Sequence, residues 1–177
     1  MEQKQERRDQ KFRDPSESPG PAKETAGEAE VEVRKIVYGS EDYAQSLKLR
    51  DRVLRRPLGR SIAGEDLSGD AQAKHIGAFL GKELVGILLL RPYRERILQM
   101  KQVAVEESLR GLNIGRKLVG YAEEIAAEEG VAEIMLHARE TAVPFYEKLG
   151  YVREGERFEE IGIPHYVMRK PLAYRVD

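Results

Sequence analysis

Cysteine is absent from this chain of 177 residues. Disulfides, thiolate catalysis and cysteine-based zinc sites are therefore excluded. Long apolar runs are also lacking, because none approaches the ~20 residues that a membrane-crossing helix needs, and no membrane association is predicted. The N-terminus is charged from its second residue and has no apolar segment, which argues against a secretory signal. These absences predict a cytoplasmic protein.

An excess of charge of one sign is missing as well. The chain has 30 Lys and Arg against 31 Asp and Glu, a formal net charge of −1. Because proteins that bind nucleic acids gain affinity from cations on phosphates, nucleic acid is not an expected partner. Four arginines (Arg50, Arg52, Arg55 and Arg56) do cluster on and after a predicted helix. There a solvated helix face is favoured over a nucleic-acid patch, and a contribution to an acceptor site stays open.

The first 30 residues differ in composition from the rest. They contain six basic and eight acidic residues, three prolines and a single large aromatic, Phe12. Such a segment buries too little apolar surface to offset its loss of conformational entropy on ordering. The sequence predicts a disordered charged tail over residues 1–30 and one folded domain over residues 31–173. A partner-binding arm is the alternative for the tail.

Hydrophobic periodicity and turn residues predict the elements of the folded part. Strands are expected at 31–37, 74–80, 84–90, 97–105, 133–137, 151–158 and 165–170, and helices at 42–54, 114–129 and 141–149. Residues 92–95 are predicted as a turn, Thr141 as a helix N-cap, and the apolar run 85–90 as a strand buried on both faces. This order predicts an α+β fold, a mixed sheet with helices packed on its faces.

Glycines and cations gather where the long helix at 114–129 begins. The cluster comprises Arg110, Gly111, Gly115, Arg116 and Lys117. A helix N-terminus has unpaired N–H groups and a partial positive charge, so it attracts phosphate. A nucleotide P-loop fits badly, because its two glycines are separated by four residues and are followed by Lys and a hydroxyl residue. The dinucleotide-binding pattern also fits badly, because Gly111-Leu112-Asn113 lacks its second glycine. An ordinary strand-to-helix turn that uses glycine for its geometry is the alternative.

Residues 105–115 resemble the acetyl-CoA-binding segment of the GNAT N-acetyltransferase superfamily. The family pattern is Arg or Gln, two residues of any type, Gly, any residue, then Gly or Ala; Arg110 and Gly115 match it, and so does the common glycine at 111. Asn113 stands where the family usually has glycine. Asparagine adopts a left-handed backbone more readily than most residues, so the departure is expected to preserve cofactor binding.

The resemblance covers nearly the whole folded region and implies a fold and a donor. The implied fold is a GNAT-type α+β fold with a mixed, mostly antiparallel central sheet and helices on both faces, and the implied acyl donor is acetyl-CoA. Backbone groups of Val103, Ala104 and Val105 would pair with the pantetheine arm. The pyrophosphate would lie in the loop of Arg110, Gly111, Leu112, Asn113, Ile114, Gly115 and Arg116. Because dimers are common in the family, a homodimer is expected by analogy.

Residues 142–151 are similar to the family helix that precedes the last hairpin. There a tyrosine commonly lies beside the cofactor sulfur, and by position that tyrosine is Tyr146. A phenol can protonate the departing thiolate as a general acid. The alternatives are that Tyr146 only packs at the helix end, as expected of Phe145, or only binds the cofactor.

Candidate acceptor-site residues cluster between the last two predicted strands. Glu159, Glu160 and His165 lie there, in an arrangement that also resembles the ElaA-like branch of the family. Carboxylates would attract a cationic amine and His165 could titrate near neutrality, so Glu160 and His165 are candidate catalytic residues; a solvated hairpin with a structural histidine is the alternative. His137 is a candidate base or water ligand, and His75 is expected on an outer strand without a chemical role. Without a short-spaced histidine pair, no catalytic metal is predicted.

These features predict an N-acetyltransferase that moves an acetyl group from acetyl-CoA to a primary amine, expected to be a small molecule. The reaction would be direct attack in a ternary complex, with backbone N–H groups near Val103 stabilising the tetrahedral oxyanion. The rival reading is a non-catalytic acyl-CoA-binding module that serves as a sensor or a docking unit. Tyr146 favours the enzyme.

Overall fold

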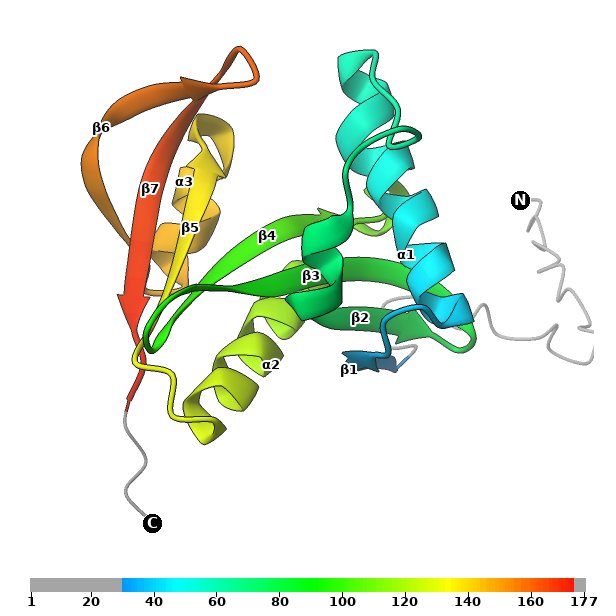
Figure 1. Ribbon diagram of the computed structural model, residues 1–177, viewed down its shortest axis with the longest axis horizontal. Helices are drawn as coiled ribbons and strands as arrows, with labels where there is room; N and C mark the ends of the chain where they lie inside the picture. Colours follow the sequence, from blue (N-terminus) through cyan, green and yellow to red (C-terminus); the bar gives the residue numbers. More distant parts are fainter. Residues whose placement is uncertain (1–29, 174–177) are drawn as a thin grey trace, which may run out of the picture.

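The computed structural model describes residues 30–173 (Figure 1). The tail predicted for residues 1–30 therefore lies outside the described residues, apart from Glu30. The strands of the described region are β1 (Val31–Ile36), β2 (Lys74–Leu80), β3 (Glu83–Arg94), β4 (Ile97–Val105), β5 (Glu133–Arg139), β6 (Val152–Glu160) and β7 (Ile163–Pro171). Its α-helices are α1 (Glu41–Arg50), α2 (Ile114–Glu128) and α3 (Val143–Lys148), and short helical turns are η1 (Asp51–Arg55), η2 (Arg56–Leu58), η3 (Ser68–Gln72), η4 (Glu107–Leu109) and η5 (Glu140–Ala142).

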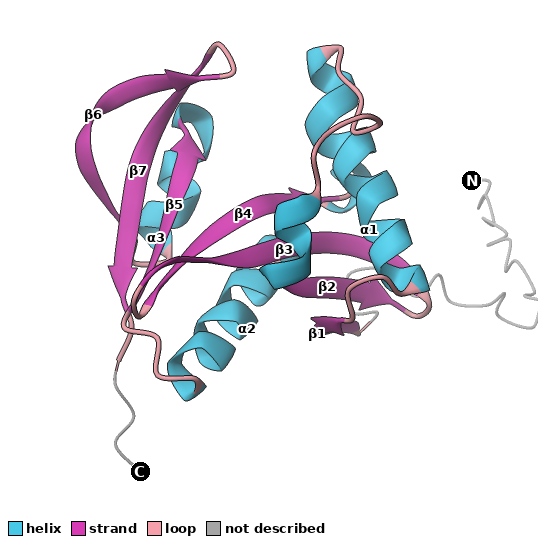
Figure 2. Cartoon of the chain, viewed as in Figure 1, coloured by secondary structure: helices cyan, strands magenta, loops and turns pink. Residues whose placement is uncertain are grey.

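All seven strands join one sheet in the order β1-β2-β3-β4-β5-β7-β6 (Figure 2). Every neighbouring pair is antiparallel except β4 and β5, which run parallel. A parallel pair needs a long crossover, and α2 supplies it. The predicted mixed, mostly antiparallel sheet is confirmed.

Helices cover both faces of this sheet, as predicted (Figure 1). On one face α2 packs its apolar stripe, including Leu118, Ala122 and Ile125, against β1 to β4. On the other face α1 covers Phe79 and Leu89. Residues 85–90 of β3 are all buried, so the prediction of a strand buried on both faces is confirmed.

A bulge in β4 changes the direction of its side chains. In the pairing with β3, Ile87 lies opposite Ala104 and Leu89 opposite Lys101, so β4 uses one residue more than β3 over this interval. The extra residue is accommodated at Gln102, whose φ is +55°. Met100 accordingly faces α2 while Ala104 faces α1, although residues four apart in a regular strand share a face.

Two local predictions are wrong. Residues 92–94 continue β3 and are not a turn; Pro92 is tolerated because β2 pairs only as far as Leu90, so no N–H is needed on that side. Thr141 does not cap α3, because it lies in η5 and the N-cap is Ala142, which has no side-chain cap bond. Among the residues that the structure describes, no helix is long and apolar enough to cross a membrane.

Candidate active site

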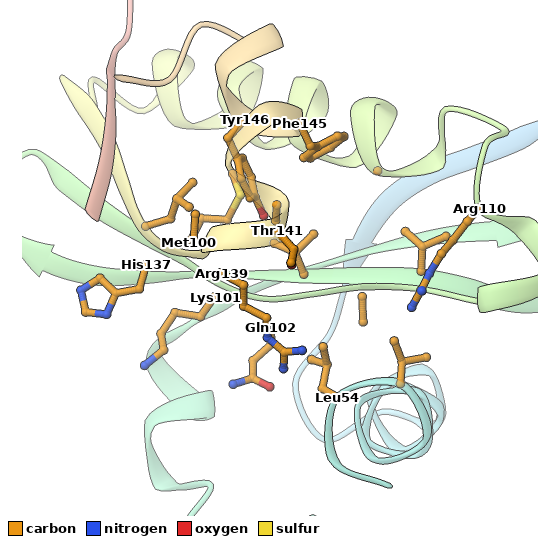
Figure 3. Close-up of a pocket in the computed structure, with 18 of the residues that line it drawn as sticks. Leu54, Met100, Lys101, Gln102, Arg110, His137, Arg139, Thr141, Phe145 and Tyr146 are labelled. Carbon is orange, nitrogen blue, oxygen red and sulfur yellow. The ribbon is translucent and has the colours of Figure 1, made fainter. Parts of the chain in front are cut away.

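A cavity of about 660 Å³ lies where β4 separates from β5. Their parallel pairing ends at Met100 and Leu136, and β4 beyond that point pairs with β3 alone. The walls come from η1, β4, the loop before α2, β5, α3 and the end of the β6–β7 hairpin (Figure 3). Thus segments far apart in the sequence meet around one space.

The glycine-rich loop forms one end of this cavity. Gly111 has φ +91° and Asn113 has φ +60°, so the asparagine adopts the left-handed conformation for which it was predicted to be suited. The first intrahelical bond of α2 runs from the Lys117 N–H to the Asn113 carbonyl, which leaves the preceding N–H groups of the first turn without helical partners. A Cβ on Gly115 would lie 3.3 Å from the Phe145 ring, so a bulkier residue would crowd this wall.

The predicted cofactor residues are brought together with one exception. The lining includes Val103, Ala104, Val105, Arg110, Gly111, Asn113, Ile114, Gly115 and Arg116. Leu112 is not among the lining residues and packs against the α2 core instead. The Leu112 side chain therefore lies outside the cavity.

Tyr146 lies in the middle of the cavity wall, on α3 (Figure 3). Its side chain is largely buried and meets the rings of Phe145 and Tyr151 edge-on, with centroids 5.0 and 5.7 Å away. Burial raises the pKa of Tyr146 to about 12. The phenol is therefore protonated at neutral pH, as a proton donor must be.

Glu160 joins two histidines at the other end of the cavity. Its Oε1 lies 3.3 Å from His137 Nδ1 and its Oε2 lies 3.6 Å from His165 Nε2. The Nδ1 of His165 is 2.7 Å from the Ile163 carbonyl; because a carbonyl only accepts, Nδ1 carries the proton and Nε2 is left facing Glu160. Phe158 contacts both imidazoles, with ring centroids 5.1 and 5.9 Å away.

The structure places Glu160 and His165 on strands, whereas the sequence predicted a loop for this cluster. Glu160 ends β6 and His165 lies within β7, so the turn between the strands is only Ile161 and Gly162. His165 is buried and is not part of a solvated turn. Glu159, one residue earlier, is not among the cavity-lining residues.

Two other predictions about basic residues need correction. His75 lies on β2, which is paired on both sides and is not an outer strand; its Nε2 is 2.8 Å from the Asp70 carbonyl, away from the cavity. Arg50 is not on a solvated face. It is buried and donates to the Asp70 carboxylate at 2.6 Å, and Tyr43 donates to the same oxygen at 2.7 Å.

Sequence reasoning missed several cavity residues, namely Val53, Leu54, Gln102, Lys101 and Arg139. The first two reach the cavity because α1 continues as the π-helix η1, a geometry frequent at functional sites. Lys101 and Arg139 are cations within or at the end of strands, which was a usable signal. Burial lowers the pKa of Lys101, and the Arg91 charge lowers it further while Glu160 opposes the shift. Within residues 30–173, no group of three or more His, Asp or Glu side chains is arranged to hold a metal ion.

Comparison with known proteins identifies the family. The model of the acetyltransferase (GNAT) domain matches residues 52–172. The chain belongs to the GNAT acetyltransferase family. A Bacillus subtilis (strain 168) protein named as an acetyltransferase is 32% identical over 145 residues, which cover 79% of this chain and 96% of that protein.

Solved structures of GNAT proteins agree with this assignment. Escherichia coli ElaA is 26% identical, with a TM-score of 0.67 over 80% of this chain and 99% of its own, in line with the ElaA-like resemblance. An aminoglycoside 6′-N-acetyltransferase in complex with coenzyme A has the same fold, with 21% identity and a TM-score of 0.67 over 82% of this chain and 99% of its own. The predictions of a GNAT fold and of an acyltransferase are confirmed.

Proposed function

We propose that this GNAT acetyltransferase transfers an acetyl group from acetyl-CoA to the primary amine of a small molecule, by direct attack in a ternary complex. The observation that carries the proposal is that one continuous cavity joins a glycine-rich helix N-terminus to Glu160 and two histidines, with Tyr146 between them. One space that borders a phosphate-binding end and a titratable end suits two substrates held side by side.

The donor is proposed to lie along β4. Backbone N–H groups at the start of α2, with Arg110 and Arg116 beside them, suit the pyrophosphate. Residues 103–105 have no strand partner on the β5 side, so their outward backbone groups are available to the pantetheine amides. The coenzyme A bound by the aminoglycoside acetyltransferase of the same fold supports this choice of donor.

The acceptor chemistry is proposed to begin at Glu160. An incoming ammonium loses a proton to this carboxylate or to His165, and its nitrogen attacks the thioester carbonyl. Outward N–H groups near Val103 stabilise the oxyanion. When the intermediate collapses, the C–S bond breaks, Tyr146 protonates the CoA thiolate, and the second proton released by the amine nitrogen returns to the phenolate. The 3.6 Å separation of Glu160 and His165 is too long for a hydrogen bond, but such contacts commonly tighten when substrate binds.

The test is release of free thiol from acetyl-CoA in the presence of a panel of primary amines. At least one amine should accelerate release and appear as its N-acetyl product by mass spectrometry. Acetyl-CoA binding without acceleration by any amine would refute amine acetylation and favour a binding module.

A homodimer and a cytoplasmic location stay predictions. The oligomeric state can be tested by light scattering.

A further inference from the structure

Two cations in the acceptor end of the cavity form no ion pair among the described residues. Lys101 on β4 and Arg139 at the end of β5 both line the cavity, and neither makes an ion pair with any residue between 30 and 173. Glu160 is the one carboxylate in the lining, and it is already placed between two histidines. The acceptor end is therefore richer in positive than in negative charge.

The fold directs both cations inward. The bulge at Gln102 turns Lys101 and Gln102 toward the side of Leu54, as Figure 3 shows. Arg139 lies two residues after His137, so both side chains share one face of β5. In the pairing with β7, Arg139 is opposite His165, and cross-strand partners also share a face. The two cations and the Glu160 cluster therefore border the same space.

Neither the cofactor nor a neighbouring side chain accounts for these charges. Arg110 and the glycine-rich loop lie across the cavity from Lys101 and His137 in Figure 3, so phosphates bound there would be neutralised by other cations. Arg55, another basic residue of the lining, already donates to both carboxylate oxygens of Glu65 at 2.6 and 3.1 Å. Lys101 and Arg139 remain for the acceptor itself.

A bound anion would stabilise the charged ammonium form of Lys101. Burial and the nearby Arg91 charge both disfavour its ammonium form and lower its pKa, and the Glu160 charge offsets only part of this shift. A buried charge is costly unless it is paired, and an opposite charge within a few ångströms favours the charged form. Arg139 adds a planar fork of donors, which matches a carboxylate with two parallel hydrogen bonds.

We propose that the acceptor is an amine that also carries a carboxylate, that is, an amino acid or a close derivative. The amine faces Glu160, while the carboxylate faces Lys101 and Arg139. This inference rests on the proposed function and names the substrate class of the same site. It also accounts for the mixed charges of the cavity, because a zwitterion places one charge against each group of opposite sign.

The test compares matched pairs that differ only in the carboxylate: phenylalanine with phenethylamine, and β-alanine with ethylamine. Thiol release from acetyl-CoA should show kcat/KM higher by about tenfold or more for the acid of at least one pair, on the scale of a charge-assisted contact. Phosphoethanolamine with ethanolamine forms a third pair. Equal rates within every pair, or a preference confined to the phosphate, would overturn the carboxylate assignment.

Variants assign the preference to the two cations. Arg139→Gln and Lys101→Met should each lower the acid-to-amine ratio of kcat/KM toward one, whereas Arg94→Gln, on an exposed arginine outside the cavity, should leave the ratio and the activity unchanged. An unchanged ratio in both cavity variants, with unaltered CoA binding as evidence of folding, would also overturn the inference. Failure of every amine, charged or neutral, would instead refute the proposed function.

Discussion

The two ends of the cavity are built in different ways. The proposed donor end comes from residues 103–116, a continuous strand, loop and helix start, and the contacts proposed for it are mainly with backbone groups. The acceptor end gathers side chains from η1, β4, β5, β6 and β7. Backbone recognition depends on chain geometry, so it tolerates replacements such as Asn113. Side-chain recognition depends on which strands are neighbours, so single substitutions there should change specificity.

The largest effect is expected at Tyr146, where the two ends meet. Tyr146→Phe removes the proton donor and keeps the ring, so kcat should fall about 100-fold or more, in the range of general acid catalysis. The dissociation constant of CoA, measured by calorimetry, should change less than about threefold, because the donor end is intact. Equal losses in kcat and CoA affinity would show that Tyr146 acts in binding.

Substitution of Glu160 should impair the reaction of the amine without changing the binding of acetyl-CoA. Glu160→Gln keeps the shape of the side chain but removes its charge, so kcat/KM for the amine should fall by about 10- to 100-fold. The acetyl-CoA dissociation constant should stay the same. Glu159→Gln is the matched control, because Glu159 itself does not line the cavity, and this variant should retain activity. A loss as large as that of Glu160→Gln would contradict the assignment.

Asn113 offers the reciprocal test at the donor end. Asn113→Val places a β-branched residue at φ +60°, which costs about 1–2 kcal/mol and should raise the KM for acetyl-CoA several-fold. Asn113→Gly should bind acetyl-CoA as well as the parent chain does, because glycine accepts this conformation freely. Amine KM should change little in both. Weak binding by the glycine variant would mean that the asparagine side chain contacts the cofactor.

The smallest effect is a pH dependence of stability. Burial raises the pKa of Tyr146 to about 12, so between about pH 10 and 12 the unfolded chain loses this proton while the folded chain keeps it. The unfolded state then binds fewer protons, and the free energy of unfolding falls as pH rises. Urea titrations should show a shallower fall in Tyr146→Phe. If the free energy of unfolding falls equally steeply with pH in the parent chain and in Tyr146→Phe, the phenol is exposed to solvent and its pKa is not raised by burial.

Sequence patterns predicted the regular elements well, since periodicity and turn residues act over a few positions. They were weaker where the chain departs from regular geometry. Neither the π-helix at 51–55 nor the bulge at Gln102 has a periodic pattern, and these two features turn Leu54 and Lys101 into the cavity. Arg50 was misassigned because a charged residue is normally exposed, and the buried Asp70 partner lies 20 residues away.

The sequence by itself determined the local structure of the proposed donor end, because a strand, two glycines and a helix N-terminus that follow one another form the same local structure wherever they lie in the sheet. The family resemblance of residues 142–151 also pointed to Tyr146, which lies on α3 and lines the cavity. The sequence also named Glu160 and His165 as candidates for the proposed acceptor end, but only the tertiary structure decided which other side chains surround them. Lys101, Arg139 and Glu160 are brought together by the order β4-β5-β7-β6 and by the early end of the β4–β5 pairing. Side chains from separate strands meet only once the sheet has formed, which no local pattern specifies.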